Sequence, residues 1–296
     1  MDIPVIDLAP YLEIAGRLSG GPADLPGQLG SSLSELCGEV SRVLRETGAL
    51  VVKDPRCSAE DNDRFIDMME KYFERPEEFK RLQERPNLHY QVGVTPEGVE
   101  VPRSLVDEEM QEKLKSMPNE VQPATPKGPD RKWRYMWRIG PRPLNTRFKE
   151  LNSEPVIPEG FPEWKETMDS WGYKMISAIE AVAEMAAIGF GLPKDAFTSL
   201  MKQIEWLTAG DCMAGMHEVV VTKRTIDAVK LASEQNCSLW RVSSTLFAHV
   251  ASDAVLKPLG HFASSPLADK YPPIRAGEFV EQELAVINLK GSKAES

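Results

Sequence analysis

Two polar residues on neighbouring predicted strands are the part of this sequence best suited to chemistry. His217 opens the apolar run 217–222, and Arg241 lies in the alternating run 238–249. A neutral imidazole can ligate a metal ion, and the planar guanidinium of arginine can hold a carboxylate through two parallel hydrogen bonds. The alternative for His217 is structural, because a single histidine beside a valine run is more often a buried, hydrogen-bonded residue. Residue chemistry alone favours that structural interpretation.

Three segments rich in β-branched and aromatic residues must position these two side chains. They cover residues 204–209, 217–222 and 238–249, and we predict neighbouring strands of an antiparallel sheet. The Gly-Asp pair at 210–211 predicts a turn, while 222–236 carries apolar residues at roughly helical spacing and predicts a helical excursion. In this arrangement the histidine and the arginine converge in the mouth of a barrel.

The sequence around both residues resembles the C-terminal part of the iron(II)- and 2-oxoglutarate-dependent dioxygenases, in the isopenicillin-N-synthase-like class that is abundant in plants. The similar motifs are L-T-A-G-D-x-M-x-x-x-H-E, at 207–218, and W-R-V-S-S-T-L-F, at 240–247. The resemblance implies that His217 is the last metal ligand and that Arg241 and Ser243 hold the distal carboxylate of 2-oxoglutarate. The spacing departs from the family, since the arginine follows the histidine by 24 residues, more than twice the usual separation.

The N-terminal region resembles the same family independently. The motif I-P-V-I-D-L at 3–8 and the motif T-G-A-L-V-V at 47–52 flank an amphipathic helix, as in family members. The resemblance implies fold class α+β, with a double-stranded β-helix (jelly roll) and flanking helices. It also implies Fe(II) as cofactor, 2-oxoglutarate as co-substrate, ascorbate as a further candidate, and hydroxylation or a related oxidation of a small organic metabolite.

The family's other two metal ligands are missing from their expected place. They form an H-x-D or H-x-E motif upstream of the last histidine, completing a triad of two histidines and one carboxylate. The chain has four histidines, none of which opens such a motif: His89, His217, His249 and His261. Only a few strand-like runs follow Gly191, whereas a jelly roll needs eight strands. We therefore predict an incomplete barrel and an internal deletion close to Lys202 and Gln203, through splicing, genomic loss or a gene-model error.

Two other stretches supply candidate substrate contacts. The irregular stretch 86–102 commonly borders the active-site entrance in family members, and the basic and aromatic stretch 131–138 often forms an extra strand near their substrate pocket. The alternatives are a surface loop for the first and, for the second, aromatic side chains packed on a sheet with arginine at its rim. Interleaved basic and aromatic residues can also stack nucleotide bases or hold an acidic substrate. The candidate substrate contacts are His89, Tyr90, Arg134, Trp137 and Arg138.

Composition and charge narrow the class of protein. A hydrophobic content of 42% and a net charge of −10 describe a globular acidic chain, which argues against a nucleic-acid-binding protein. The most apolar run, 178–192, contains two glutamates and is too short to span a bilayer. With no signal peptide evident and scattered cysteines that suit reduced thiols, we expect a cytoplasmic protein with no membrane partner.

Apolar periodicity predicts most of the remaining elements. The predicted helices cover 32–47, 105–117, 162–191 and 276–284, with others beginning at Ser58 and Pro76. The predicted strands cover 3–8 and 49–53. Ser58 with Asp61 three residues later predicts a helix-capping box.

We predict four parts and two competing functions. The parts are an N-terminal helical region at 1–117, a proline-rich connector at 118–162, a truncated oxygenase region at 163–291 and a tail at 292–296. One function is oxidation of a small-molecule substrate, impaired because one metal ligand of three is found. The other is an inactive variant that only binds ligands or self-associates through unpaired sheet edges.

Overall fold

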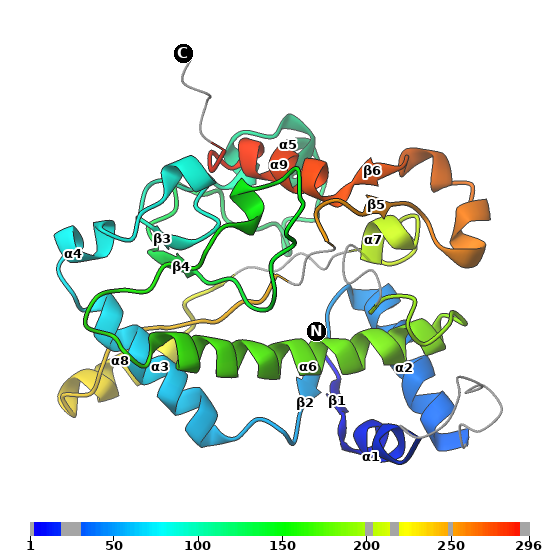
Figure 1. Ribbon diagram of the computed structural model, residues 1–296, viewed down its shortest axis with the longest axis horizontal. Helices are drawn as coiled ribbons and strands as arrows, with labels where there is room; N and C mark the ends of the chain where they lie inside the picture. The colour runs from blue at the N-terminus through cyan, green and yellow to red at the C-terminus, as the bar shows by residue number, and fades with distance from the viewer. Residues whose placement is uncertain (1–2, 19–30, 199–203, 214–218, 248–250, 291–296) are drawn as a thin grey trace.

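A long helix, α6 (Trp164–Gly189), runs through the molecule, and the other elements are arranged around it (Figure 1). The computed structural model describes residues 3–18, 31–198, 204–213, 219–247 and 251–290. The predicted helix over 162–191 is confirmed by α6, whose apolar residues recur every three or four positions.

The N-terminal elements form a small layer on α6. Strands β1 (Val5–Asp7) and β2 (Val51–Lys53) pair in parallel, with α1 (Ala9–Leu18) and α2 (Ser31–Thr47) between them in the chain. These elements confirm the predicted strands at 3–8 and 49–53 and the helix at 32–47. Gly48 follows α2 with a φ of 64°, a left-handed conformation that glycine adopts without strain and that ends the helix.

Helices α2 and α6 pack so closely at Gly189 that no side chain fits there. A Cβ atom at Gly189 would lie 2.1 Å from the carbonyl oxygen of Cys37 and 2.6 Å from Oγ of Ser41. Glycine is therefore required where α6 crosses α2. Around this contact lies the first core, whose buried residues include Ile6, Leu8, Cys37, Val40, Met185, Phe190 and Leu207.

A second core forms where α3 (Ala59–Phe73) meets the first half of α6. The predicted capping box begins α3, because the Ser58 side chain accepts from the Asp61 backbone and Asp61 accepts from the Ser58 backbone. We call this core the aromatic cluster; its buried members are Phe65, Met68, Met69, Tyr72, Val94, Phe161, Trp164 and Met168. Tyr72 and Trp164 are fully buried, with ring centroids 5.0 Å apart. Such ring pairs contribute about 0.5–1.5 kcal/mol beyond the area that they bury.

The remaining elements are short and lie around these two cores. The helices are α4 (Glu77–Arg81), α5 (Glu108–Lys115), α7 (Ile204–Leu207), α8 (Lys223–Glu234) and α9 (Ala276–Val286). The strands are β3 (Gly93–Thr95), β4 (Arg134–Met136), β5 (Val255–Leu256) and β6 (Ile274–Arg275). Single 3₁₀ turns cover Pro86–Leu88, Arg103–Leu105, Glu150–Asn152, Gly260–Ser264 and Ala268–Lys270. Helices α4, α5 and α9 confirm the helices predicted from Pro76, over 105–117 and over 276–284.

The prediction of an antiparallel sheet over 204–249 is wrong wherever the structure describes that segment. Residues 204–207 form α7, which ends through Ala209 and Gly210, both with positive φ, and Gly210 N–H donates to the carbonyl of Glu205 at 2.8 Å. The described residues 219–222 and 238–247 contain no strand. The helical excursion is confirmed by α8, which a capping box at Thr222 and Thr225 begins.

The strands form three separate pairs: β1 with β2, β3 with β4 and β5 with β6. The class is therefore mixed helix and sheet, and within the described ranges no closed barrel is present. The boundaries predicted near 117 and 162 stay a prediction, although β4, in the predicted connector, pairs with β3 from the N-terminal region. None of the described helices is long and apolar enough to cross a membrane.

Candidate functional site

The pair β3–β4 and the residues that follow it hold most of the candidate substrate contacts. The strands run antiparallel, with Val94 opposite Tyr135 and Thr95 opposite Arg134. Tyr135 packs edge-on against Trp164 of α6, with ring centroids 4.6 Å apart. The pair is thereby fixed to the aromatic cluster on one of its faces.

Alternate residues of this stretch point toward α6. Trp137 Nε1 donates to Oδ1 of Asp169 on α6 at 2.8 Å, and a Cβ atom at Gly172 of α6 would meet Ile139. Successive side chains of an extended segment point to opposite faces. Residues 135, 137 and 139 therefore face α6, and Arg134 faces away from it, together with Thr95.

The face turned away from α6 gathers buried polar atoms without partners. Arg134 forms an ion pair with Glu100, 2.9 Å between Nη1 and Oε2. Its Nε lies buried without a hydrogen-bond partner, as do Oγ1 of Thr95 and Nε of Arg138. Most buried polar groups in proteins are hydrogen-bonded, so these three exceptions mark the strand pair and the residues after it as unusual.

Arg138 is the least satisfied of these residues. It is half-buried, and its one hydrogen bond joins Nη1 to the carbonyl of Leu151 at a long 3.4 Å. Across the part of the chain that the structure describes, it has no carboxylate partner. Burial, followed by repulsion from Arg142, lowers the pKa of Arg138. The structure therefore places a partly dehydrated positive charge at the end of this stretch.

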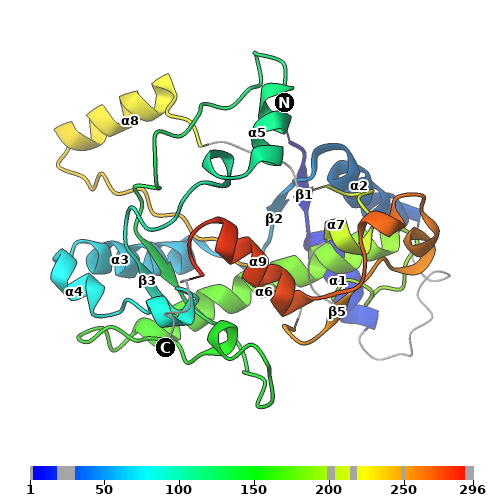
Figure 2. The ribbon, with the colours of Figure 1, turned by 90° about the horizontal axis from the view of Figure 1, so that it is seen from above.

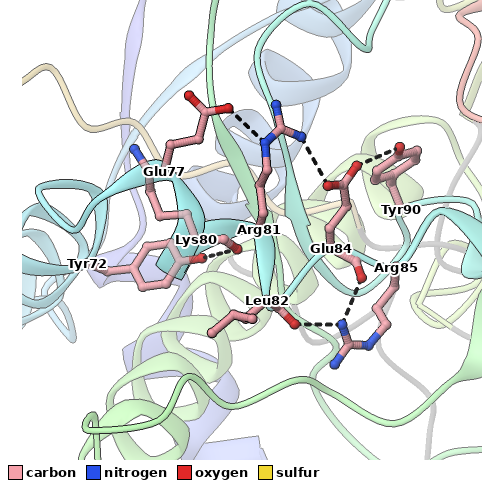
Figure 3. A network of polar contacts seen from close by, with 8 residues as sticks. All are labelled: Tyr72, Glu77, Lys80, Arg81, Leu82, Glu84, Arg85 and Tyr90. Carbon is pink, nitrogen blue, oxygen red and sulfur yellow. Dashed lines mark hydrogen bonds and ion pairs between the residues drawn. The ribbon is translucent and has the colours of Figure 1, made fainter.

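His89 and Tyr90 lie on the turn that leads into β3. Both have positive φ, 52° and 54°. The Tyr90 hydroxyl donates to Oε1 of Glu84 at 3.0 Å, and Glu84 is paired with Arg81, as Figure 3 shows. Burial, with the Glu84 contact, raises the pKa of Tyr90 to about 12. Tyr90 is therefore engaged in a structural network, whereas His89 Nδ1 is buried without a partner.

Arg241 and Ser243 lie on an extended segment beside the same aromatic cluster. Val242 between them packs against the cluster, and Trp171 of α6 donates its Nε1 to Oγ of Ser244 at 2.9 Å. Arg241 and Ser243 themselves are exposed. His217 lies outside the described residues, so the predicted meeting of these three side chains stays a prediction.

The described residues do not fit an iron site. They contain no group of three His, Cys, Asp or Glu side chains able to hold a metal ion. His261 is exposed, its ring against Phe262, and His89 stands on the turn before β3. His249, like His217, lies outside the described ranges. A triad of two histidines and one carboxylate is therefore not formed by the described part of the chain.

A cavity of about 1050 Å³ lies between α5 and the loop 123–131. Its wall includes Lys127, Arg131 and Val219, the last only two residues beyond His217 in the sequence. The candidate substrate contacts do not line it. Sequence analysis missed this feature because the loop was interpreted as a connector. A usable signal is proline at every third position, 123, 126 and 129, which favours a stiff extended wall.

Comparisons with known proteins agree only at the level of structure. No protein-family model matches the sequence, and no curated protein matches it significantly. A crystal structure described as a 2OG-Fe(II) oxygenase family protein from Caulobacter crescentus aligns with 96% of this chain and 98% of its own, at 16% identity and a TM-score of 0.65. The full-length thymine hydroxylase of Neurospora crassa, in complex with alpha-KG, aligns over 96% of each chain, at 13% identity and a TM-score of 0.58.

Because the sequence identities to both proteins are low, the structural likeness bears on the fold and not on the reaction. The alignment runs through both cores and through the strand pairs attached to them, because it spans nearly the whole of both chains. The chain therefore shares its overall fold with these two proteins.

Proposed function

We propose that this chain descends from the 2OG-Fe(II) oxygenases, in the isopenicillin-N-synthase-like class, and that its oxidation of a small organic metabolite is impaired. The observation that carries the proposal is the likeness to the Caulobacter crescentus structure, with a TM-score of 0.65 over 96% of this chain. The N-terminal motif at 3–8 and the motif at 240–247 support it from the sequence. A jelly roll that has lost strands near Lys202 and Gln203, which lie outside the described residues, belongs to the same proposal.

The proposed roles follow the motifs. His217 is the metal ligand, and Arg241 and Ser243 hold the distal carboxylate of 2-oxoglutarate. The side chains proposed to contact the substrate are His89, Tyr90, Arg134, Trp137 and Arg138. Fe(II), with 2-oxoglutarate and ascorbate, supplies oxidation chemistry where it is bound. We place the protein in the cytoplasm, with a small-molecule ligand.

We infer impaired oxidation from the number of metal ligands, because only one of the family's three is found. Each additional ligand on one scaffold binds a metal ion that is already localised, so losing two of three removes most of the affinity. Neighbouring carboxylates are poor replacements. Asp211 forms an ion pair with Arg45, 2.9 Å between Oδ2 and Nε.

Succinate formation from 2-oxoglutarate tests this proposal. We expect iron-dependent succinate formation by the wild-type chain to be no greater than by His217→Ala or Arg241→Ala, because a site with one ligand does not retain iron. Iron-dependent formation in the wild type that either substitution abolishes would show an active oxygenase.

A second candidate function, binding without catalysis, is favoured by the segment 219–247, which we call the arm. In Figure 2 its helix α8 lies at the edge of the molecule, away from α6. Most of its large apolar side chains are exposed: Val219, Val220, Val221, Ile226, Val229, Leu231, Leu239, Trp240 and Phe247. Exposed apolar side chains gathered on one segment are typical of an interaction surface.

Charge indicates what the arm binds. It carries four basic and two acidic side chains, whereas the whole chain has a net charge of −10. A basic arm on an acidic body is complementary to the body of a second copy. We therefore propose self-association through the arm, in place of the sheet edges expected from the sequence.

A further inference from the structure

Arg138 has the surroundings of a residue that binds an anion. Its guanidinium is half-buried, its Nε is buried without a partner, and its contact with the Leu151 carbonyl is 3.4 Å long. The neighbouring cation Arg142 is itself paired with Glu154. Arg134 of the same stretch differs from Arg138, because it forms an ion pair with Glu100.

A buried arginine normally has a counter-charge. Removing a cation from water is costly, and the cost is recovered only through a nearby anion or a full set of hydrogen bonds. Arg138 has neither among the described residues, and repulsion from Arg142 adds to the cost. A structure that retains such a group gains from it when an anion binds.

The fold holds the chain on both sides of Arg138. Trp137 before it is bonded to Asp169, and Ile139 after it packs at Gly172, so α6 holds both neighbours. Arg138 reaches the carbonyl of Leu151 through Nη1, so its guanidinium lies beside the turn at Glu150–Asn152. A preorganised fork loses little conformational entropy on binding a planar anion.

We propose that Arg138, with Arg142 beside it, binds the carboxylate of a small organic acid. The planar, two-oxygen geometry of a carboxylate matches the guanidinium fork, which can donate two parallel hydrogen bonds to it. This inference deepens the proposed function by giving its substrate class as a carboxylic acid, and it rests on that function only in naming the ligand a substrate. Binding itself needs neither iron nor His217.

The test is calorimetric titration of the full chain with 2-oxoglutarate, succinate or inorganic phosphate, in the presence of a metal chelator. We expect both carboxylates to bind, and Arg138→Gln to weaken binding by about tenfold or more, the scale of one charge-assisted, bidentate contact. Arg138→Lys keeps the charge and loses the fork, so it should lie between the two. Arg42→Gln, an exposed arginine on α2, is the matched control and should bind as the wild type does.

A second readout separates binding from a structural role. Without carboxylate, thermal unfolding of Arg138→Gln should occur at the wild-type temperature or above, because the substitution removes an uncompensated cation. With carboxylate, only proteins that keep Arg138 should be stabilised. A lower unfolding temperature for Arg138→Gln in buffer alone would show that the arginine is structural, and would overturn the proposal.

The remaining outcomes of the titration also test the proposal. Binding of phosphate alone, or binding that Arg138→Gln leaves unchanged, contradicts a carboxylate site at this residue. Metal-free binding that is lost in Arg241→Ala and kept in Arg138→Gln assigns the anion to the other arginine. If carboxylate binding depends on Arg138 but iron-dependent succinate formation is missing, the anion site is supported. That result bears on catalysis alone.

Discussion

At the scale of single residues, Asp61 links the start of α3 to α6. Its Oδ2 accepts from the Ser58 backbone at 3.0 Å and lies 2.8 Å from Nζ of Lys174. The contact with Lys174, then the Ser58 backbone bond, lowers the pKa of Asp61 to about 2. The charged carboxylate therefore stabilises the folded state.

The sign of the resulting pH dependence follows from this lowered pKa. The unfolded chain takes up the proton first, so the contribution is present above the ordinary aspartate pKa of 3.8 and is lost as the pH falls toward about 2. We expect Asp61→Asn to unfold at a lower temperature than wild type at pH 6, with the difference closing toward pH 2. Thermal unfolding across this range measures it.

The control is Asp67→Asn on the same helix, which should follow the wild-type curve at every pH. A difference between Asp61→Asn and wild type that stays constant down to pH 2 would contradict the assignment.

Sequence reasoning predicted some residues well and others only by type. The capping box was predictable because its two side chains interact within one turn. Arg138 was predictable as basic and near aromatics, but its missing counter-ion depends on which carboxylates the fold brings close. Glu100 reaches Arg134 and not Arg138, a difference that no local pattern encodes.

At the scale of elements, the α2–α6 contact supplies a paired prediction. Gly189→Ala places a Cβ atom 2.1 Å from the Cys37 carbonyl, so the helices must separate. We expect a loss of about 1–3 kcal/mol in the free energy of unfolding, as for other overpacked sites. Urea denaturation measures this loss.

Gly38→Ala on α2 is the matched control, since nothing lies within 4 Å of its Cβ position. Alanine favours the helix over glycine, so this variant should gain about 0.5–1 kcal/mol. Equal effects of the two substitutions would show that helix propensity, and not the close contact, decides at Gly189.

Elements with strong local signals were predictable, and those that need a partner were not. Helix α6 has apolar residues at helical spacing over 26 residues, which determines it locally. The segment 204–209 is short and apolar, so periodicity alone could not separate strand from helix. In the run 238–247 only Val242 and Leu246 are partly buried, and no strand lies beside it among the described residues.

At the scale of the whole molecule, the arm predicts concentration-dependent dimerisation. Val221 is the most exposed of its large apolar side chains, at 74%. Val221→Asp removes apolar surface and adds a negative charge facing an acidic body. We therefore expect it to weaken dimerisation about tenfold or more in sedimentation velocity, and added salt to weaken the wild-type dimer.

Val106→Asp is the control, because Val106 is also exposed, at 52%, but lies outside the arm. It should dimerise as the wild type does. A wild-type chain that stays monomeric at all concentrations would remove the arm as a self-association surface.

The arrangement of the whole chain was the part least available from the sequence. Motifs at both ends indicated the oxygenase fold, and the structural likeness supports that fold over 96% of the chain. An incomplete barrel was expected, and the described residues contain no closed barrel, only three separate strand pairs. Which strands pair was not predictable, because strand pairing depends on residues that lie far apart in the sequence. The cavity beside α5 is lined by residues between 102 and 131, to which the fold adds the distant Val219.

The central claim is an oxygenase fold whose metal centre is incomplete. The most direct test is an anaerobic calorimetric titration of the monomeric chain with Fe(II), with 2-oxoglutarate present. We predict no stoichiometric binding of iron by a folded, soluble sample. One-to-one binding at micromolar affinity would contradict the claim, because it would require other residues to complete the site.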